Sequence, residues 1–204
     1  MKKHILISLI IISFFSCKNE SIKQKNGFKE DKQIELVKEE KIYEVINFVL
    51  DSIIKHSEEN TNYVTGETMF FMDQDSTDYF GISKMDSIFS EKDVKFILQQ
   101  RKIRMDFNLK NDLLKNKIVI PKDTLVKFSE KQKGASEFWD KFWKKYGNKG
   151  FYSISKPLFS LDNKTVIITF GINCGSLCGE WKTVIYKKTK HKWKLIKVLQ
   201  ITVS

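Results

Sequence analysis

The chain lacks the short motifs that mark common catalytic sites. It contains no G-x-S-x-G, H-E-x-x-H, G-x-x-x-x-G-K or G-x-G-x-x-G segment. This removes the sequence signatures of a serine hydrolase elbow, a zinc protease, a P-loop and a dinucleotide fold. Histidine is also scarce, with 3 in 204 residues. A pair of carboxylates for glycan hydrolysis has no fixed spacing, so that class of enzyme stays open.

Arginine is nearly absent from a basic chain. The sequence has 36 lysine and arginine residues against 25 acidic ones, a net charge of +11, yet only Arg101 and Arg104 are arginines. Base readout and bidentate phosphate contacts favour arginine, so we predict no nucleic-acid partner. A lysine-rich surface is typical of simple solvation, and attraction to anionic lipid headgroups or acidic glycans is the alternative.

Long apolar runs are missing as well. The apolar segment at residues 5–15 extends about 16 Å as a helix, roughly half of a ~30 Å hydrocarbon core. It follows the basic start Lys2-Lys3-His4 and precedes Ser16 and Cys17, after which the chain becomes polar. A basic start, an apolar run and a small residue, in this order, are typical of a secretory signal peptide.

A cysteine directly after such a run resembles the bacterial lipoprotein signal. The resemblance implies that residues 1–16 are a signal peptide, and that Cys17 carries the lipid and becomes the mature N-terminus. It places the protein in the bacterial cell envelope, anchored by lipid, most consistently at the outer membrane on its periplasmic or surface face. Plain secretion and an uncleaved anchor are the alternatives, although the bulky Phe14 disfavours ordinary cleavage after Ser16.

The remaining sequence divides into a polar tether at residues 17–32 and one domain at residues 33–204. Apolar residues at three- and four-residue spacing predict a helix from Ile34 to about His56. Further helices are predicted over residues 90–100, capped by Ser90, and over residues 136–146, capped by Ser136 and ended by Gly147.

Strands are predicted mainly in the last third of the chain. Residues 69–72 and 117–120 form short candidates, the second ended by Pro121. From residue 151 the apolar period changes to two, with runs at residues 165–172, 180–187 and 193–203 separated by turn signals. We therefore predict an α+β fold in which N-terminal helices pack on a C-terminal antiparallel β-meander.

Cys174 and Cys178 flank a short glycine-containing turn between two predicted strands. With Cys17 assigned to lipid, they remain as a pair, and an oxidising envelope favours a disulfide between them. Its role would be to rigidify the loop, whose glycines admit unusual backbone angles. A thiol–disulfide exchange site is the more specific functional alternative, and a zinc site completed by His56 and His191 is a weaker one.

The C-terminal third also carries a longer pattern. Residues 155–160 read S-K-P-L-F-S and are followed by Asp162, the C-G-S-L-C-G turn at residues 174–179, and Trp193. From residue 138 to 204 this pattern resembles a family of bacterial envelope lipoproteins with an S-x-P strand and a CGxLCG turn. The family has no assigned activity, so the resemblance implies a location and no catalytic residue.

Three further features have both a structural and a functional interpretation. The acidic turn at residues 73–78 is typical of a solvated loop, with a calcium loop as the alternative. Trp139, Trp143 and Tyr146, beside several lysines, are explained by core packing or by a ligand platform. His56 at a helix end and His191 in a hairpin turn are predicted to be structural.

We predict a lipid-anchored binding module without a cofactor or metal, whose partner besides the membrane is an envelope protein or a glycan. A glycan-directed envelope hydrolase with unidentified carboxylates is the alternative, and a structural spacer is a third possibility.

Overall fold

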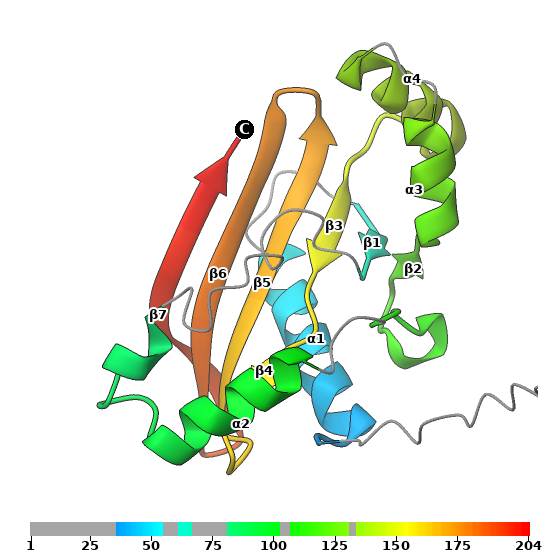
Figure 1. Ribbon diagram of the computed structural model, residues 1–204. Coiled ribbons are helices and arrows are strands. Elements are labelled where there is room, and N and C mark those ends of the chain that lie inside the picture. The colour runs from blue at the N-terminus through cyan, green and yellow to red at the C-terminus, as the bar shows by residue number, and fades with distance from the viewer. Residues whose placement is uncertain (1–35, 55–60, 67–80, 103–106, 131–133) are drawn as a thin grey trace, which may run out of the picture. The chain divides into compact units, whose positions relative to one another are not determined.

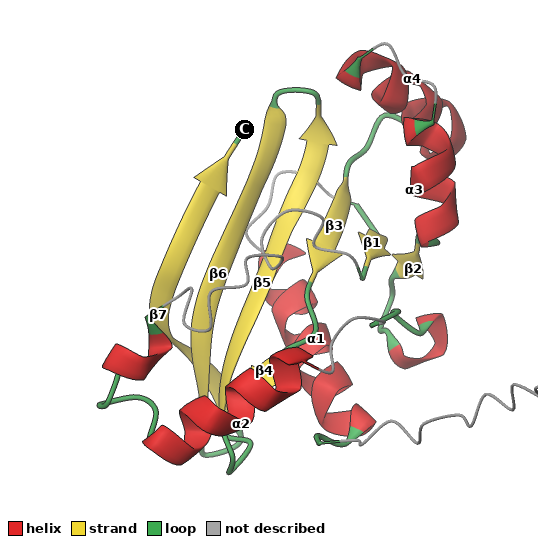
Figure 2. Cartoon of the chain, in the orientation of Figure 1, coloured by secondary structure: helices red, strands yellow, loops and turns green. Residues whose placement is uncertain are grey.

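Helices come first in the chain and long strands come last, which confirms the predicted α+β class (Figures 1 and 2). The computed structural model describes residues 36–54, 61–66, 81–102, 107–130 and 134–204. They belong to one compact unit, Gln33–Ser204, while the unit Met1–Lys32 lies outside the described residues. In chain order the elements are α1 (Glu39–Ile54), β1 (Tyr63–Thr65), the 3-10 helix η1 (Ile82–Lys84), α2 (Glu91–Lys102), the 3-10 helix η2 (Asn111–Leu113), β2 (Ile118–Val119), α3 (Lys122–Ser129), α4 (Ala135–Tyr146), β3 (Phe151–Ile154), β4 (Leu158–Phe159), β5 (Thr165–Gly175), β6 (Cys178–Thr189) and β7 (Lys192–Val203).

The strands form one mixed sheet in the order β2-β1-β3-β5-β6-β7, with β4 also paired to β5. Strands β5, β6 and β7 make the predicted antiparallel meander. By contrast, β1 pairs in parallel with both β2 and β3. The sequence did not predict this parallel edge, because strands of two or three residues are too short to show a period.

Strand β5 is buried on both faces. Neighbouring residues of a strand point to opposite sides of the sheet. Val166 and Ile168 pack in the cluster that contains the apolar residues of α1, whereas Ile167 packs with those of α2. Figure 1 shows α1 behind the sheet and α2 in front of it. Helices therefore cover both faces, and the buried residues of the clusters all lie within the unit Gln33–Ser204, which contains its own core.

One edge of β5 is shared by two short strands, because Pro157 interrupts the pairing. Strand β3 pairs with residues 170–173 and β4 pairs with residues 166–167. At the join, the Ser155 N–H donates to the Thr169 carbonyl at 2.8 Å, and the Ser155 hydroxyl accepts the Thr169 N–H at 3.0 Å. The Ser155 side chain thus supplies the acceptor for the Thr169 N–H at the point where the ladder passes from β3 to β4.

Helix α2 completes the hydrogen bonding of β4 through one side chain. The Gln100 amide nitrogen donates to the Phe159 carbonyl at 2.7 Å, and the Gln100 amide oxygen accepts the Phe159 N–H at 3.0 Å. Phe159 is fully buried and Gln100 is 9% exposed. The amide therefore pairs with the backbone as a neighbouring strand would, and it fixes α2 to the sheet.

Helices α3 and α4 form a third cluster with the β1–β3 edge of the sheet. Phe142 and Phe151 are at its centre, with ring centroids 5.0 Å apart. Helix α3 was not predicted, since its 8 residues are too few to show a sustained period. Its start follows directly from Pro121, which ends β2 and precedes the first helical residue.

The structure confirms some of the predicted helix ends and contradicts others. Helix α1 begins at Glu39 rather than at residue 34. Glu39 and Glu40 lie in its first turn, where negative charge is favourable to the helix dipole. Ser90 caps α2 as predicted, exchanging hydrogen bonds with Asp93. The predicted cap at Ser136 is wrong, because α4 begins one residue earlier with Gly134 at the capping position. Gly147 ends α4 with φ of 81°, as predicted.

We predict that Gln100→Ala lowers the free energy of unfolding by about 2–3 kcal/mol, because it leaves a buried N–H and a buried carbonyl of Phe159 without their partner. Urea denaturation measures the change. Gln99→Ala, on the exposed side of the same helix, is the matched control and should change stability little. Equal effects of the two substitutions would contradict this role of Gln100.

Candidate functional site

The predicted cysteine hairpin joins β5 to β6. Cys174 and Cys178 form a disulfide with their Cα atoms 5.1 Å apart, in agreement with the predicted pairing. Gly175 pairs with Cys178 in the ladder, so that Ser176 and Leu177 alone make the turn. Leu177 is 89% exposed. The described residues contain no group of three His, Cys, Asp or Glu side chains arranged to hold a metal ion.

The glycines of this hairpin have a different role from the one predicted. Among described glycines, only Gly81 and Gly147 have positive φ, so the hairpin glycines do not supply left-handed backbone. Instead, a Cβ atom on Gly179 would lie 2.5 Å from the Trp181 ring, and one on Gly171 would lie 2.3 Å from it. The two glycines are therefore required because the Trp181 indole lies flat on the sheet above them.

The aromatic residues of α4 lie mainly in the domain core. Trp139 is 6% exposed and packs against Phe142 and Phe151, with ring centroids 5.4 and 5.9 Å away. Trp143 and Tyr146 are partly buried against the same cluster. Trp139 therefore has little surface left on which a ligand could stack, whereas Trp143 and Tyr146 keep part of theirs.

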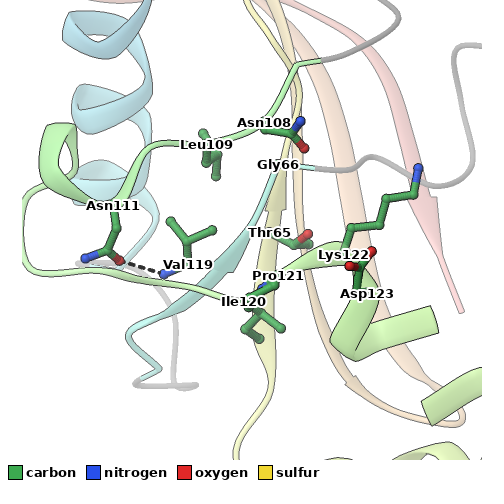
Figure 3. A pocket seen from close by; sticks show the side chains of 10 residues that line it. All are labelled: Thr65, Gly66, Asn108, Leu109, Asn111, Val119, Ile120, Pro121, Lys122 and Asp123. Atoms are coloured by element: carbon green, nitrogen blue, oxygen red, sulfur yellow. Dashed lines mark hydrogen bonds between the residues drawn. The ribbon is translucent and has the colours of Figure 1, made fainter. Parts of the chain in front are cut away.

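A pocket lies where β1 and β2 end and α3 begins. It has a volume of about 580 Å³. Figure 3 shows segment 108–111 on one side, the first residues of α3 on the other and the end of β1 between them. The lining residues are Thr65, Gly66, Asn108, Leu109, Asn111, Val119, Ile120, Pro121, Lys122 and Asp123.

The pocket wall combines polar and apolar groups. Leu109 and Ile120 are buried, which provides an apolar floor, while Asn108 and Asp123 are exposed at the rim. Asn111 holds the wall together, because its side-chain oxygen accepts the Val119 N–H at 3.0 Å. Amide, hydroxyl, carboxylate and ammonium groups around an apolar floor are suited to a small polar ligand with some apolar surface.

A second polar centre fastens the β6–β7 hairpin to α1. Glu44 on α1 accepts the Trp193 indole N–H at 3.0 Å and forms an ion pair with Lys188. Lys41 contacts the other carboxylate oxygen at 3.2 Å. Trp193, the last residue of the C-terminal sequence pattern, is thus buried near the turn of the hairpin and fixed by a charge-assisted hydrogen bond.

The shifted carboxylates have structural partners. Burial alone would raise the pKa of Glu44, but hydrogen bonds from Lys188, Trp193 and Lys41 outweigh it and lower the pKa. The pKa of Asp93 is lowered in the same way, since hydrogen bonds from Ser90 and the Leu161 N–H outweigh burial. A general acid for hydrolysis needs a raised pKa, so neither carboxylate has that character.

Several predicted sites fall outside the described residues. They are Cys17, the acidic turn at residues 73–78, the strand candidate at residues 69–72, and His56. His191 is described and lies in the two-residue turn between β6 and β7, where it is exposed. Within the described ranges, no helix combines the length and the apolarity that crossing a bilayer requires.

Sequence reasoning missed both the pocket and the Glu44 centre. The pocket is assembled from three short segments, at residues 65–66, 108–111 and 119–123, and no spacing rule connects them. Glu44 had a weak signal, as an acidic residue beside the apolar stripe of a helix, but its partners Lys188 and Trp193 are 144 and 149 residues away. No protein-family model, curated protein or solved structure matches the chain. The family resemblance of the C-terminal pattern therefore stays a prediction.

We predict that Glu44→Gln lowers the free energy of unfolding at neutral pH by about 1 kcal/mol, allowing for solvent screening of a partly exposed group. A lowered pKa means that the Glu44 carboxylate stabilises the fold above the ordinary value of 4.5. This contribution is lost as the pH falls through the lower folded-state pKa. The difference between the parent and the variant should therefore shrink toward zero in acid.

Thermal and urea unfolding across pH 3–7 measure this dependence. Glu40→Gln, on the exposed side of the same helix, is the matched control. A Glu44→Gln deficit that stays constant from neutral to acidic pH would contradict the proposed charge contribution.

Proposed function

We propose that the chain is a lipid-anchored protein of the bacterial cell envelope whose folded unit binds a ligand. The position of Cys17 carries the anchoring part, since it directly follows a basic start, a short apolar run and Ser16. A core that closes within Gln33–Ser204 supports a tether at residues 18–32 between the anchor and the domain. Two acyl chains on Cys17 would give stable attachment, which one chain does not.

The pocket at the ends of β1 and β2 carries the binding part of the proposal. Its wall offers the side-chain amides of Asn108 and Asn111, while Asp123 is its one carboxylate among the described lining residues. Glycoside hydrolysis ordinarily uses two carboxylates that flank the bond. Binding is therefore the better-supported function, and a neutral glycan, with many hydroxyls and apolar ring faces, is the ligand class that fits this wall.

Cys17→Ser should let a high-salt wash release the protein from the membrane, because the substitution removes the atom that carries the lipid and salt screens any attraction of the lysines to the headgroups. Fractionation of cells into soluble and membrane parts, followed by mass spectrometry of the N-terminus, measures the change. Conservative substitution of a neighbouring residue, Ser21→Ala, is the control and should leave the protein in the membrane fraction. A Cys17→Ser protein that carries no leader and still sediments with membranes after a high-salt wash would contradict lipid anchoring.

A soluble N-acetylglucosamine oligomer should shift the backbone amide signals of the pocket residues in a ¹⁵N NMR titration. Asn108→Ala combined with Asp123→Ala should weaken binding roughly tenfold, through two lost hydrogen bonds. Asn148→Ala combined with Asp140→Ala changes the same residue types at exposed positions outside the pocket and serves as control.

Two outcomes would count against this pocket proposal. If the amide signals do not shift, or if the test and control variants lose equal affinity for the oligomer, the proposed glycan site is contradicted. Appearance of new reducing ends during the titration would favour the hydrolase instead. Neither outcome bears on Cys17, so the two parts of the proposed function are tested separately.

A further inference from the structure

The β6–β7 hairpin carries charge of one sign along most of its length. From Trp181 to Ser204 the sequence contains no aspartate or glutamate. Five of its lysines have exposed side chains around the turn and along β7, and His191 lies at the tip. These lysines are Lys187, Lys190, Lys192, Lys194 and Lys197, and together with His191 they are called here the basic hairpin.

Three acidic groups on neighbouring elements already have structural partners. Glu44 on α1 binds Lys188 and Trp193. In the turn between β4 and β5, Asp162 accepts the Ser160 hydroxyl at 2.7 Å and the Lys164 N–H at 3.0 Å. Asp93 on α2 accepts the Leu161 N–H at 2.8 Å. None of these three carboxylates forms an ion pair with a lysine of the basic hairpin; the one lysine of β6 and β7 that Glu44 contacts is Lys188.

The ladder places like charges opposite each other. Lys187 of β6 is the direct register partner of Lys194 of β7. Like charges at directly opposed positions destabilise a pair of strands. An anionic surface in contact with both lysines would remove this repulsion.

The turn itself has an unfavourable backbone for its residues. Lys190 has φ of 47° and His191 has φ of 67°, so both are left-handed. A two-residue turn of this kind favours Asn-Gly, because bulky side chains are strained at positive φ. Strained residues that persist in a fold concentrate at functional positions. The turn keeps basic side chains at the tip where Asn-Gly would relieve the strain.

Exposed apolar side chains lie on the same edge strand as the lysines, where Lys194 and Leu195 project from opposite faces of β7 and both can reach a surface along that edge. Leu195 is 53% exposed and Ile196 is 46% exposed on β7, and Leu161 is 54% exposed in the turn between β4 and β5. The Lys188 N–H donates to the Lys164 carbonyl at 2.7 Å, which holds this turn beside β6. An anionic bilayer surface takes up both lysine charge and apolar side chains. A soluble acidic polymer would use the charge alone.

We propose that the basic hairpin, with Leu161, Leu195 and Ile196, is a docking surface for an anionic lipid bilayer. Lysine suits this partner because headgroup attraction needs charge and not the bidentate geometry of arginine. Glu44 makes the surface rigid by fixing both strands of the hairpin to α1. This proposal rests on the proposed membrane anchor only because the anchor would bring the domain close to a bilayer; the docking surface itself does not include Cys17.

Sedimentation with vesicles tests the docking surface. The protein used is residues 18–204, which lacks the leader and Cys17 and retains the whole unit with its core. It should bind phosphatidylcholine vesicles that contain phosphatidylglycerol, and binding should weaken as salt is added. It should bind pure phosphatidylcholine vesicles much less.

A triple variant tests the lysines: Lys190→Gln, Lys192→Gln and Lys194→Gln. It should partition onto anionic vesicles less than the parent by a factor on the order of 100, which is about one order of magnitude or less per lysine. Lys127→Gln, Lys144→Gln and Lys149→Gln remove the same charge from exposed positions near α3 and α4, at the other end of the sheet. This control should bind like the parent. Circular dichroism and thermal unfolding verify that each variant is folded.

Leu195→Ser combined with Ile196→Ser should also weaken vesicle binding, which a purely electrostatic contact would not show. If the hairpin and control triple variants lose equal affinity for anionic vesicles, the proposal is overturned, because the net charge of the protein alone would then determine vesicle binding. Tighter binding to polyglutamate or single-stranded DNA than to anionic vesicles would overturn it as well. Because these proteins lack Cys17, neither result depends on whether the native chain is lipidated.

Discussion

The pairing of β5 along both edges is the constraint on which the rest of the fold depends. Strand β6 takes one edge, and β3 and β4 together take the other. Because both faces of β5 are buried, backbone groups that lose a ladder partner cannot turn to water. Side chains replace the missing partners: Ser155 serves Thr169, and Gln100 serves Phe159. These polar contacts then fix where α2 and the β4–β5 turn lie.

The S-x-P and CGxLCG pattern is explained by this constraint. Ser155 repairs the ladder beside Pro157, and the Ser160 hydroxyl accepts the Thr165 N–H at 2.9 Å at the start of β5. The cysteines close the other end of the strand, and Trp193 joins the next hairpin to α1. The pattern therefore specifies packing and strand register, while the pocket and the basic hairpin are built mainly from residues outside it.

Sustained periodicity made α1 and the meander predictable, because each repeats its apolar signal over many residues. The parallel strands β1 and β2, helix α3 and the pocket were not predictable in this way. Each is short, and tertiary contacts with distant segments determine its conformation. The glycines beside Trp181 show the same limit. A glycine in a sequence indicates either a backbone conformation with positive φ or a close approach of other atoms, and the structure shows that here the close approach of the Trp181 ring is the reason.

The two proposed surfaces lie at opposite edges of the sheet. The order β2-β1-β3-β5-β6-β7 puts the pocket beside β2 and the basic hairpin on β6 and β7. A hairpin held against a bilayer would therefore leave the pocket at the edge directed away from the lipid. The contacts that Glu44 makes near the turn matter for this geometry, because a hairpin that could move relative to α1 would not define which edge faces outward. Anchor, docking surface and pocket would then act together, with the tether limiting distance and the sheet setting orientation.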